Sequence, residues 1–141
     1  MSQTVLITGA SNGIGKACAR VFARKGYDLV LVARHREKLE AVKAELSEYD
    51  VNIKVVAMDL TGEDAAVDLY NNLVLDDISI DILVNNAGFG DHGAFHDASW
   101  EKQKKMVLLN IMALMQMTYV FGQSMKRRKK GRILNVASIA G

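Results

Sequence analysis

Short apolar runs alternate along the chain with segments in which apolar residues recur at helical spacing. The runs have the length and the β-branched or leucine-rich composition of strands that are buried on both faces of a parallel sheet. They predict strands over residues 4–8, 29–33, 53–58, 82–85 and 133–137. The helical stripes are Ile14, Ala17, Cys18, Val21 and Phe22, then Leu39, Val42 and Leu46, then Ala66, Leu69 and Leu73, and finally a long helix over 99–130. Gly26 is expected to end the first helix as its C′ residue.

Strict alternation of strands and helices predicts an α/β fold with a parallel sheet that is covered on both faces. Right-handed crossovers then favour a doubly wound sheet of five strands in the order 3-2-1-4-5. The length of 141 residues suits a single domain. Ligands bind such sheets at the carboxyl ends of the strands, where the strand order reverses. That point lies between the first and fourth strands, and glycine-rich segments follow both of them.

The segment "TGASNGIG", residues 8–15, joins the first predicted strand to the first predicted helix. Its glycines allow a tight turn, and free N–H groups at the helix start can hold a pyrophosphate. An ordinary glycine-rich turn is the alternative, but the strand–loop–helix context favours dinucleotide binding. The residues expected to contact the cofactor here are Gly9, Ser11, Asn12, Gly13, Ile14 and Gly15.

The end of the second strand bears on the choice of cofactor. A free ribose 2′-hydroxyl is usually bound by a carboxylate at this position, whereas "VARHREKL" supplies Arg34 and no acid before Glu37. Arginine suits a 2′-phosphate through charge-assisted hydrogen bonds, so the sequence favours NADP over NAD. Arg36 is interpreted as part of a solvated helix start. Asp59, with Leu60 beside it, is placed to meet the adenine, and the alternative role for Asp59 is to cap the following helix.

Composition narrows the classes of partner and compartment. The net charge is only +2, and the single cysteine excludes an internal disulfide and fits a reducing, cytoplasmic location. The first ten residues lack the basic start of a secretory signal. No apolar run is judged to approach the ~20 residues of a membrane span, so no membrane partner is expected. The basic run 126–132 resembles a nucleic-acid patch. We favour a different interpretation, in which these cations complement the dipole at the C-terminal end of a helix and Gly131 ends that helix. No nucleic-acid partner is therefore expected.

Together these segments resemble the short-chain dehydrogenase/reductase family. The resemblance rests on "TGASNGIG", "MDL" at 58–60, "NNAG" at 85–88, Asn110 in the long helix and "NVAS" at 135–138. It implies a Rossmann-like fold and hydride transfer between a nicotinamide and a small-molecule alcohol or carbonyl substrate. It also implies that Asn86, Ala87 and Gly88 approach the cofactor ribose through their backbone.

The same resemblance assigns the catalytic roles. Ser138 would bind the substrate oxygen, and Asn110 would support a water that relays protons. The tyrosine acid/base and its lysine belong to a helix after the fifth strand, and no residue of this chain takes either role. The chain is therefore expected to be an incomplete dinucleotide-binding domain, inactive on its own. A cofactor-binding remnant or an interaction module without catalysis is the alternative.

Several chemistry-bearing residues have simpler interpretations as well. Asn110 could be a buried structural residue that bonds to nearby backbone, and Ser138 could be ordinary turn chemistry. Asn85 could simply tie strands together. A crowded loop suggests a metal site only weakly, because no tetrahedral ligand set is specified. The loop residues in question are Asp91, His92, His96 and Asp97.

The long methionine-rich helix is apolar on nearly all sides, so one side needs cover beyond the sheet. In the resembling family that side meets the same helix of a second subunit. The fifth strand would also expose an apolar edge that can pair with another strand. A homo-oligomer is therefore expected, formed through the 99–130 helix or through the strand-five edge.

Overall fold

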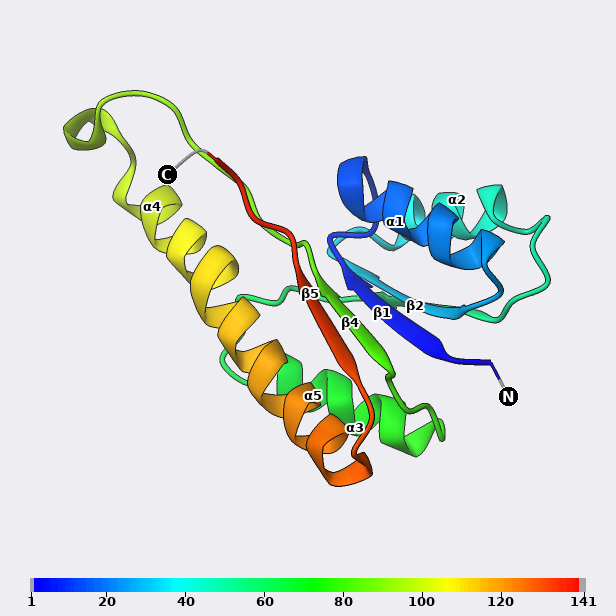
Figure 1. Ribbon diagram of the computed structural model, residues 1–141. Coiled ribbons are helices and arrows are strands. Elements are labelled where there is room, and N and C mark those ends of the chain that lie inside the picture. Colours follow the sequence, from blue (N-terminus) through cyan, green and yellow to red (C-terminus); the bar gives the residue numbers. More distant parts are fainter. Residues whose placement is uncertain (1, 140–141) are drawn as a thin grey trace.

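The computed structural model describes residues 2–139 and contains one five-stranded parallel sheet (Figure 1). The strands are β1 (Thr4–Thr8), β2 (Asp28–Ala33), β3 (Ile53–Ala57), β4 (Ile82–Asn85) and β5 (Arg132–Asn135). Their order in the sheet is β3-β2-β1-β4-β5, and every neighbouring pair is parallel. The predicted doubly wound topology is confirmed.

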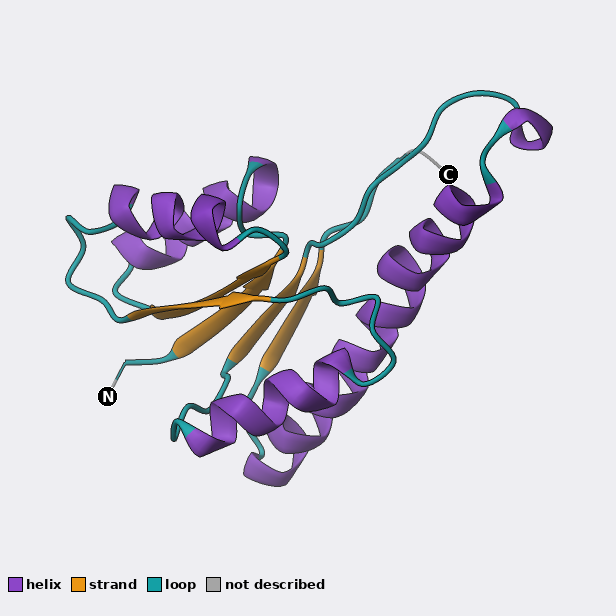
Figure 2. Ribbon diagram, turned by 180° about the vertical axis from the view of Figure 1, so that it is seen from behind, coloured by secondary structure: helices purple, strands orange, loops and turns teal. Residues whose placement is uncertain are grey.

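Helices cover the two faces of the sheet (Figure 2). Their bounds are α1 (Gly13–Arg24), α2 (Arg36–Glu45), α3 (Ala65–Leu75), α4 (Trp100–Val107) and α5 (Leu114–Arg128). One face packs against α1 and α2, where Leu31 of β2 meets Ala19 and Leu39. The other packs against α3 and α5, where Val30 of the same strand joins a core with Phe121. Successive residues of β2 therefore enter different cores, as the strand period of two requires.

The C-terminal end of α1 follows the sequence prediction. Gly26 has a φ of +82°, its N–H donates to the carbonyl of Ala23, and the N–H of Tyr27 donates to the carbonyl of Phe22. This is a Schellman motif, and the rings of Phe22 and Tyr27 supply its apolar contact at a centroid distance of 5.3 Å.

The end of α5 differs from the prediction. The helix turns at Lys129, which takes a left-handed φ of +53°, rather than at Gly131. The N–H of Lys130 then donates to the carbonyl of Met125 at 3.1 Å. Gly131 serves close packing instead, because a Cβ at this position would lie 2.3 Å from the Met125 side chain. The fifth strand starts directly afterwards, at Arg132, and ends at Asn135 rather than at Ala137.

The long helix predicted over 99–130 extends over Trp100–Arg128 and contains a π-helical segment. A π-helical segment, η2 (Leu108–Ala113), joins α4 to α5, and a short 3-10 turn, η1 (Phe95–Asp97), precedes α4. Within residues 2–139 the continuous helical stretch Trp100–Arg128 has the length and composition of a membrane span, with 29 residues and a mean hydropathy of 1.3 over its most apolar window. The expectation that no apolar run approaches this length was therefore wrong. Core helices of soluble proteins pass the same test, so length and composition do not decide between the two.

Candidate cofactor-binding site

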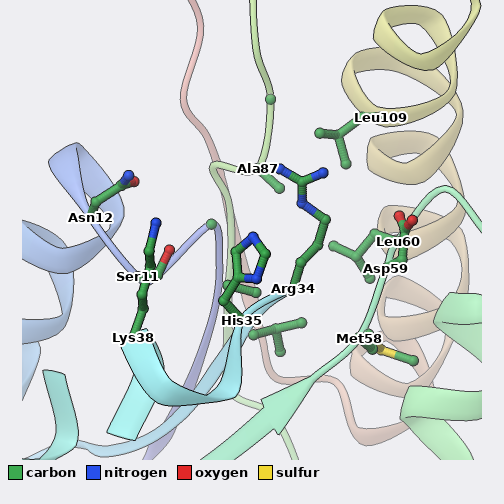
Figure 3. A pocket seen from close by; sticks show the side chains of 14 residues that line it. Ser11, Asn12, Arg34, His35, Lys38, Met58, Asp59, Leu60, Ala87 and Leu109 are labelled. Carbon is green, nitrogen blue, oxygen red and sulfur yellow. The ribbon is translucent and has the colours of Figure 1, made fainter. Parts of the chain in front are cut away.

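A cleft of about 230 Å³ opens at the carboxyl ends of the strands (Figure 3). It lies at the predicted switch point, between segments that follow β1, β2, β3 and β4, with the π segment η2 as a further wall. Its lining residues are Gly9, Ser11, Asn12, Val32, Ala33, Arg34, His35, Lys38, Met58, Asp59, Leu60, Ala87, Gly88 and Leu109. Eight of the residues predicted from the sequence to bind a cofactor are in this set, whereas Gly13, Ile14, Gly15 and Asn86 do not line the cleft.

Backbone conformation and close packing explain the glycines of the turn between β1 and α1. Gly9 has a φ of +62° and Gly13 a φ of +53°, a region that favours glycine. A Cβ on Gly15 would lie 2.2 Å from the carbonyl oxygen of Gly9, so α1 can start this close to the turn only with glycine there. The side chain of Asn12 does not cap α1, and the first turn has no acidic residue. The helix N-terminus therefore keeps N–H groups and a positive field available for an anion.

Hydrogen bonds join this turn to the segment after β4. The Thr8 hydroxyl accepts the N–H groups of Asn86 and Ala87, each at 2.9 Å. The Asn86 carboxamide donates to the carbonyls of Thr8 and Gly9, at 3.2 and 3.1 Å. Asn86 thus fixes the two glycine-rich segments relative to each other, while Ala87 and Gly88 face the cleft.

Three basic side chains enter the cleft from the end of β2 and the start of α2. Figure 3 shows Arg34, His35 and Lys38 directed into the cleft, with Lys38 on the side of Ser11 and Asn12. Only Arg34 was predicted. Arg36 lies outside the lining set and pairs with Glu40 at 3.8 Å, as the interpretation of a solvated helix start expects.

Asp59 follows β3 on the opposite wall of the cleft, where Thr61 holds its carboxylate. Its Oδ1 accepts the Thr61 N–H at 3.0 Å and the Thr61 hydroxyl at 2.7 Å. These hydrogen bonds, the backbone one first, hold the pKa of Asp59 below its usual value, with smaller contributions from the charges of Arg34 and Lys105.

The alternative role of Asp59 as a helix cap was wrong. The following helix, α3, starts at Ala65, and its N-terminal Ala66 N–H donates to the Gln116 side chain at 3.1 Å. The partner for this helix end therefore comes from α5, which is distant in sequence.

Asn110 lies in the π segment and is exposed rather than buried, contrary to the sequence expectation. Its Oδ1 accepts the Phe89 N–H at 3.1 Å and its Nδ2 donates to the Phe89 carbonyl at 2.8 Å. A Cβ on Gly88 would lie 2.9 Å from the same Oδ1. The geometry fits the structural alternative, in which this asparagine bonds to nearby backbone and fixes the loop after the cleft.

Ser138 lies three residues past the end of β5 and is exposed. The segment that contains it runs beside the loop that follows β4 in both views (Figures 1 and 2). Neither Ser138 nor Asn110 lines the cleft. Beneath them, the Asn85 side chain donates to Asn135 at 2.9 Å and to Thr118 at 3.1 Å, so Asn85 ties β4 to β5 and to α5.

The polar loop before α4 is fixed by Asp91. Its carboxylate accepts Lys102 at 2.6 Å, the His92 N–H at 3.0 Å and Gln103 at 3.3 Å. The hydrogen bond from Lys102 is the main reason that the pKa of Asp91 is lowered. Within residues 2–139, no three His, Cys, Asp or Glu side chains come together as a metal site.

Comparison with known proteins identifies relatives along the whole chain. The family model described as short chain dehydrogenase matches residues 3–141. A very-long-chain 3-oxoacyl-CoA reductase of Phaeosphaeria nodorum is 38% identical over an alignment 143 residues long, which covers 96% of this chain and 41% of that protein. Nodulation protein G of a Rhizobium species is 37% identical, over 99% of this chain and 56% of that protein.

Solved structures agree with these relatives. A metagenomic short-chain oxidoreductase in complex with NADP superposes with a TM-score of 0.93 at 34% identity, covering 99% of this chain and 64% of its own. A short-chain dehydrogenase from Sphingobium yanoikuyae in complex with NADPH gives 0.89 at 38% identity, covering 97% and 54%. The chain thus spans about half the length of the relatives it matches.

Proposed function

The chain belongs to the short-chain dehydrogenase family, and we propose that it forms the cofactor-binding part of an NADP-dependent oxidoreductase. The bound nicotinamide would exchange a hydride with an alcohol or carbonyl carbon of a small-molecule substrate. The observation that carries the proposal is the cleft at the switch point, which joins an open helix N-terminus to three basic side chains.

The turn between β1 and α1 fits a pyrophosphate. A Cβ on Gly13 would meet nothing within 4 Å, so the backbone here is open to a ligand, whereas Gly15 is tightly packed. Packing of Gly15 against Gly9 brings the helix start close to the carboxyl end of β1. The N–H groups of the first helical turn would then hold the anion in place.

The end of β2 fits a ribose 2′-phosphate. Arg34 and Lys38 line the cleft and offer a planar fork and a mobile ammonium group, both suited to phosphate. Asp59 is the only acidic residue among the described lining residues, and it lies after β3 rather than at the β2 position that binds a free 2′-hydroxyl. Two structural relatives hold NADP or NADPH, in agreement with this assignment.

Replacement of the Arg34 cation by a carboxylate tests the preference for NADP over NAD. The protein should bind NADP about tenfold or more tighter than NAD, since a charge-assisted hydrogen bond contributes about 1.5–3 kcal/mol. Arg34→Asp should reverse the preference, and the matched variant Arg36→Asp, outside the cleft, should keep it. Tighter binding of NAD by the unaltered protein in a calorimetric titration would refute the assignment to NADP.

We place the substrate next to Ser138. In the family that the chain belongs to, its hydroxyl corresponds to the group that binds the substrate oxygen, and Asn110 to the group that supports proton relay. In that family a tyrosine is the acid/base and a lysine lowers its pKa, and we assign neither role to any of residues 1–141. These residues alone should therefore bind cofactor without turnover, because loss of a general acid/base typically removes about 10²–10⁴-fold of the rate. Oxidation of NADPH by residues 1–141 with a ketone, above the rate without protein, would contradict this.

We further propose that a second copy of the chain covers the long helix. Large apolar side chains are exposed in a stripe along it, and those at least half exposed are Trp100, Val107, Ile111, Met112, Met115 and Tyr119. A stripe of this length is typical of an interaction surface. Met115→Glu should weaken self-association in sedimentation experiments, while Asn71→Glu, an exposed position on α3, should not. Monomers of the unaltered protein at high concentration would argue against this surface and against pairing through β5.

A further inference from the structure

His35 lines the cofactor cleft but has no part in the assignment above. It stands between the end of β2 and the first residue of α2, and its backbone carbonyl accepts the Leu39 N–H at 3.3 Å. Its side chain does not cap the helix. In Figure 3 the imidazole ring is seen between the side chains of Arg34 and Lys38, and all three residues line the same cleft.

Both signs of charge occur near His35, and the acids include Glu37 in the first turn of α2. Arg34 and Lys38 are cations, and the N-terminus of α2 adds a partial positive charge. Asp59, the one acid among the described lining residues, is held by Thr61, and α4 presents Lys105, whose charge acts on Asp59. On the outer side of α2, Glu40 is paired with Arg36. Within the described residues, no carboxylate is thus paired with the imidazole.

A phosphate bound between Arg34 and Lys38 would lie within reach of the His35 ring. A 2′-phosphate brings up to two negative charges into the same space and favours the protonated ring, which then donates a charge-assisted hydrogen bond. NAD lacks this group and leaves the charges as they were.

We propose that His35 is a specificity residue for the 2′-phosphate and that it acts in its protonated form. The preference for NADP over NAD then grows as the pH falls through the range in which imidazole titrates. Near the upper end of that range, binding of NADP draws less than one proton per molecule from the solvent onto the ring. The inference rests on the proposed function, because it requires that the cleft bind both dinucleotides.

The test is a set of dissociation constants for NADP and NAD at pH 8.5, 7.5 and 6.5, at constant ionic strength, for the unaltered protein, His35→Gln and His35→Lys. In the unaltered protein the ratio of the two constants should shift about three- to tenfold toward NADP between pH 8.5 and 6.5. In His35→Gln the preference for NADP should stay constant or decrease as the pH falls. The reason is that a phosphate monoester takes up a proton near pH 6 and loses part of its charge. In His35→Lys the preference should be high at every pH, since lysine stays charged.

Each contrary result has a distinct meaning. The inference is overturned if the unaltered protein and His35→Gln show the same pH dependence. It is also overturned if His35→Gln weakens NAD and NADP equally, as stacking on adenine would. In both cases a preference that Arg34→Asp reverses would leave the proposed function standing. Failure of the unaltered protein to bind either dinucleotide would overturn the proposed function and this inference together.

Discussion

Two strands of the same parallel sheet, β2 and β5, were both predicted from apolar runs but have opposite surroundings. In β2, Leu31 and Val32 are fully buried, with a strand on each side and helices on both faces. In β5, Ile133 is 38% exposed and Leu134 is 47% exposed, and β4 is the strand's only neighbour within residues 2–139.

The difference in cover between β2 and β5 also distinguishes the cofactor cleft from the segment that carries Ser138. The cofactor cleft takes its walls from segments that follow β1, β2, β3 and β4, so its geometry is set by the covered part of the sheet. Ser138 follows β5, at the open edge. An apolar run therefore predicts a strand, but whether the strand is covered depends on what packs against it.

The same substitution in both strands should have the largest and most unequal effect. Leu31→Ala removes a fully buried side chain from the core between β2, α1 and α2, and should lower the free energy of unfolding by about 2–5 kcal/mol. Leu134→Ala removes a half-exposed side chain and should cost less than about 1 kcal/mol. Urea titrations would measure both, and equal losses would show that β5 is as well covered as β2.

Gly15→Ala should come next. The new Cβ would press on the Gly9 carbonyl and on the Asn86 side chain, so the turn or α1 must move. We expect a loss of about 1–3 kcal/mol in unfolding free energy together with loss of NADP binding. Gly62→Ala is the matched control, because its Cβ would meet neighbours only at 3.6 and 3.7 Å and should change stability by less than about 0.5 kcal/mol. Normal NADP affinity in Gly15→Ala would contradict the packing argument.

A smaller, local effect is expected for Asn110→Ala. It removes two hydrogen bonds to the Phe89 backbone, each worth about 1 kcal/mol or less at an exposed site. The Phe89 amide should then exchange its hydrogen about five- to tenfold faster, whereas Asn71→Ala on α3 should leave that rate unchanged. An unaltered rate in Asn110→Ala would mean that the loop after β4 is held by other contacts.

Asp59→Asn should give the smallest effect, and this effect should disappear in acid. Because the folded-state pKa of Asp59 is lowered, its ionised form stabilises the fold above the ordinary value of 3.8, and this contribution disappears as the pH falls through the folded-state pKa. The advantage of the unaltered protein over Asp59→Asn should stay below about 1 kcal/mol, since water screens an exposed carboxylate, and should shrink below about pH 4. A difference that grows in acid would reverse the sign of this argument.

Much of the fold follows from local patterns in the sequence. The strands are apolar runs, and the end of α1 is marked by Gly26, so both could be predicted. The end of α5 could not, because Lys129 adopts a conformation that usually marks glycine or asparagine, and Gly131 packs against Met125 instead. The partner of the α3 N-terminus was also out of reach, since Gln116 is about fifty residues away in sequence.

The residues of the candidate site could be predicted where a side chain suited to cofactor binding directly follows a strand. Arg34 directly follows β2, and the structure places it in the cleft. His35 and Lys38 were missed because the direction of their side chains depends on where α2 starts. The spacing in the sequence could have indicated that they lie together, because Lys38 comes one helical turn after His35 and residues at that spacing share a helix face. Asn110 was expected to be buried because its neighbours are apolar, but the π segment and the open face of the long helix leave it exposed.

Amide hydrogen exchange with and without saturating NADP tests the central claim most directly. If the cleft binds the dinucleotide, protection should rise at residues 9–15, 34–38 and 86–88, while β5 should exchange as before. Unchanged exchange in these three segments, with protection appearing elsewhere or nowhere, would contradict the account.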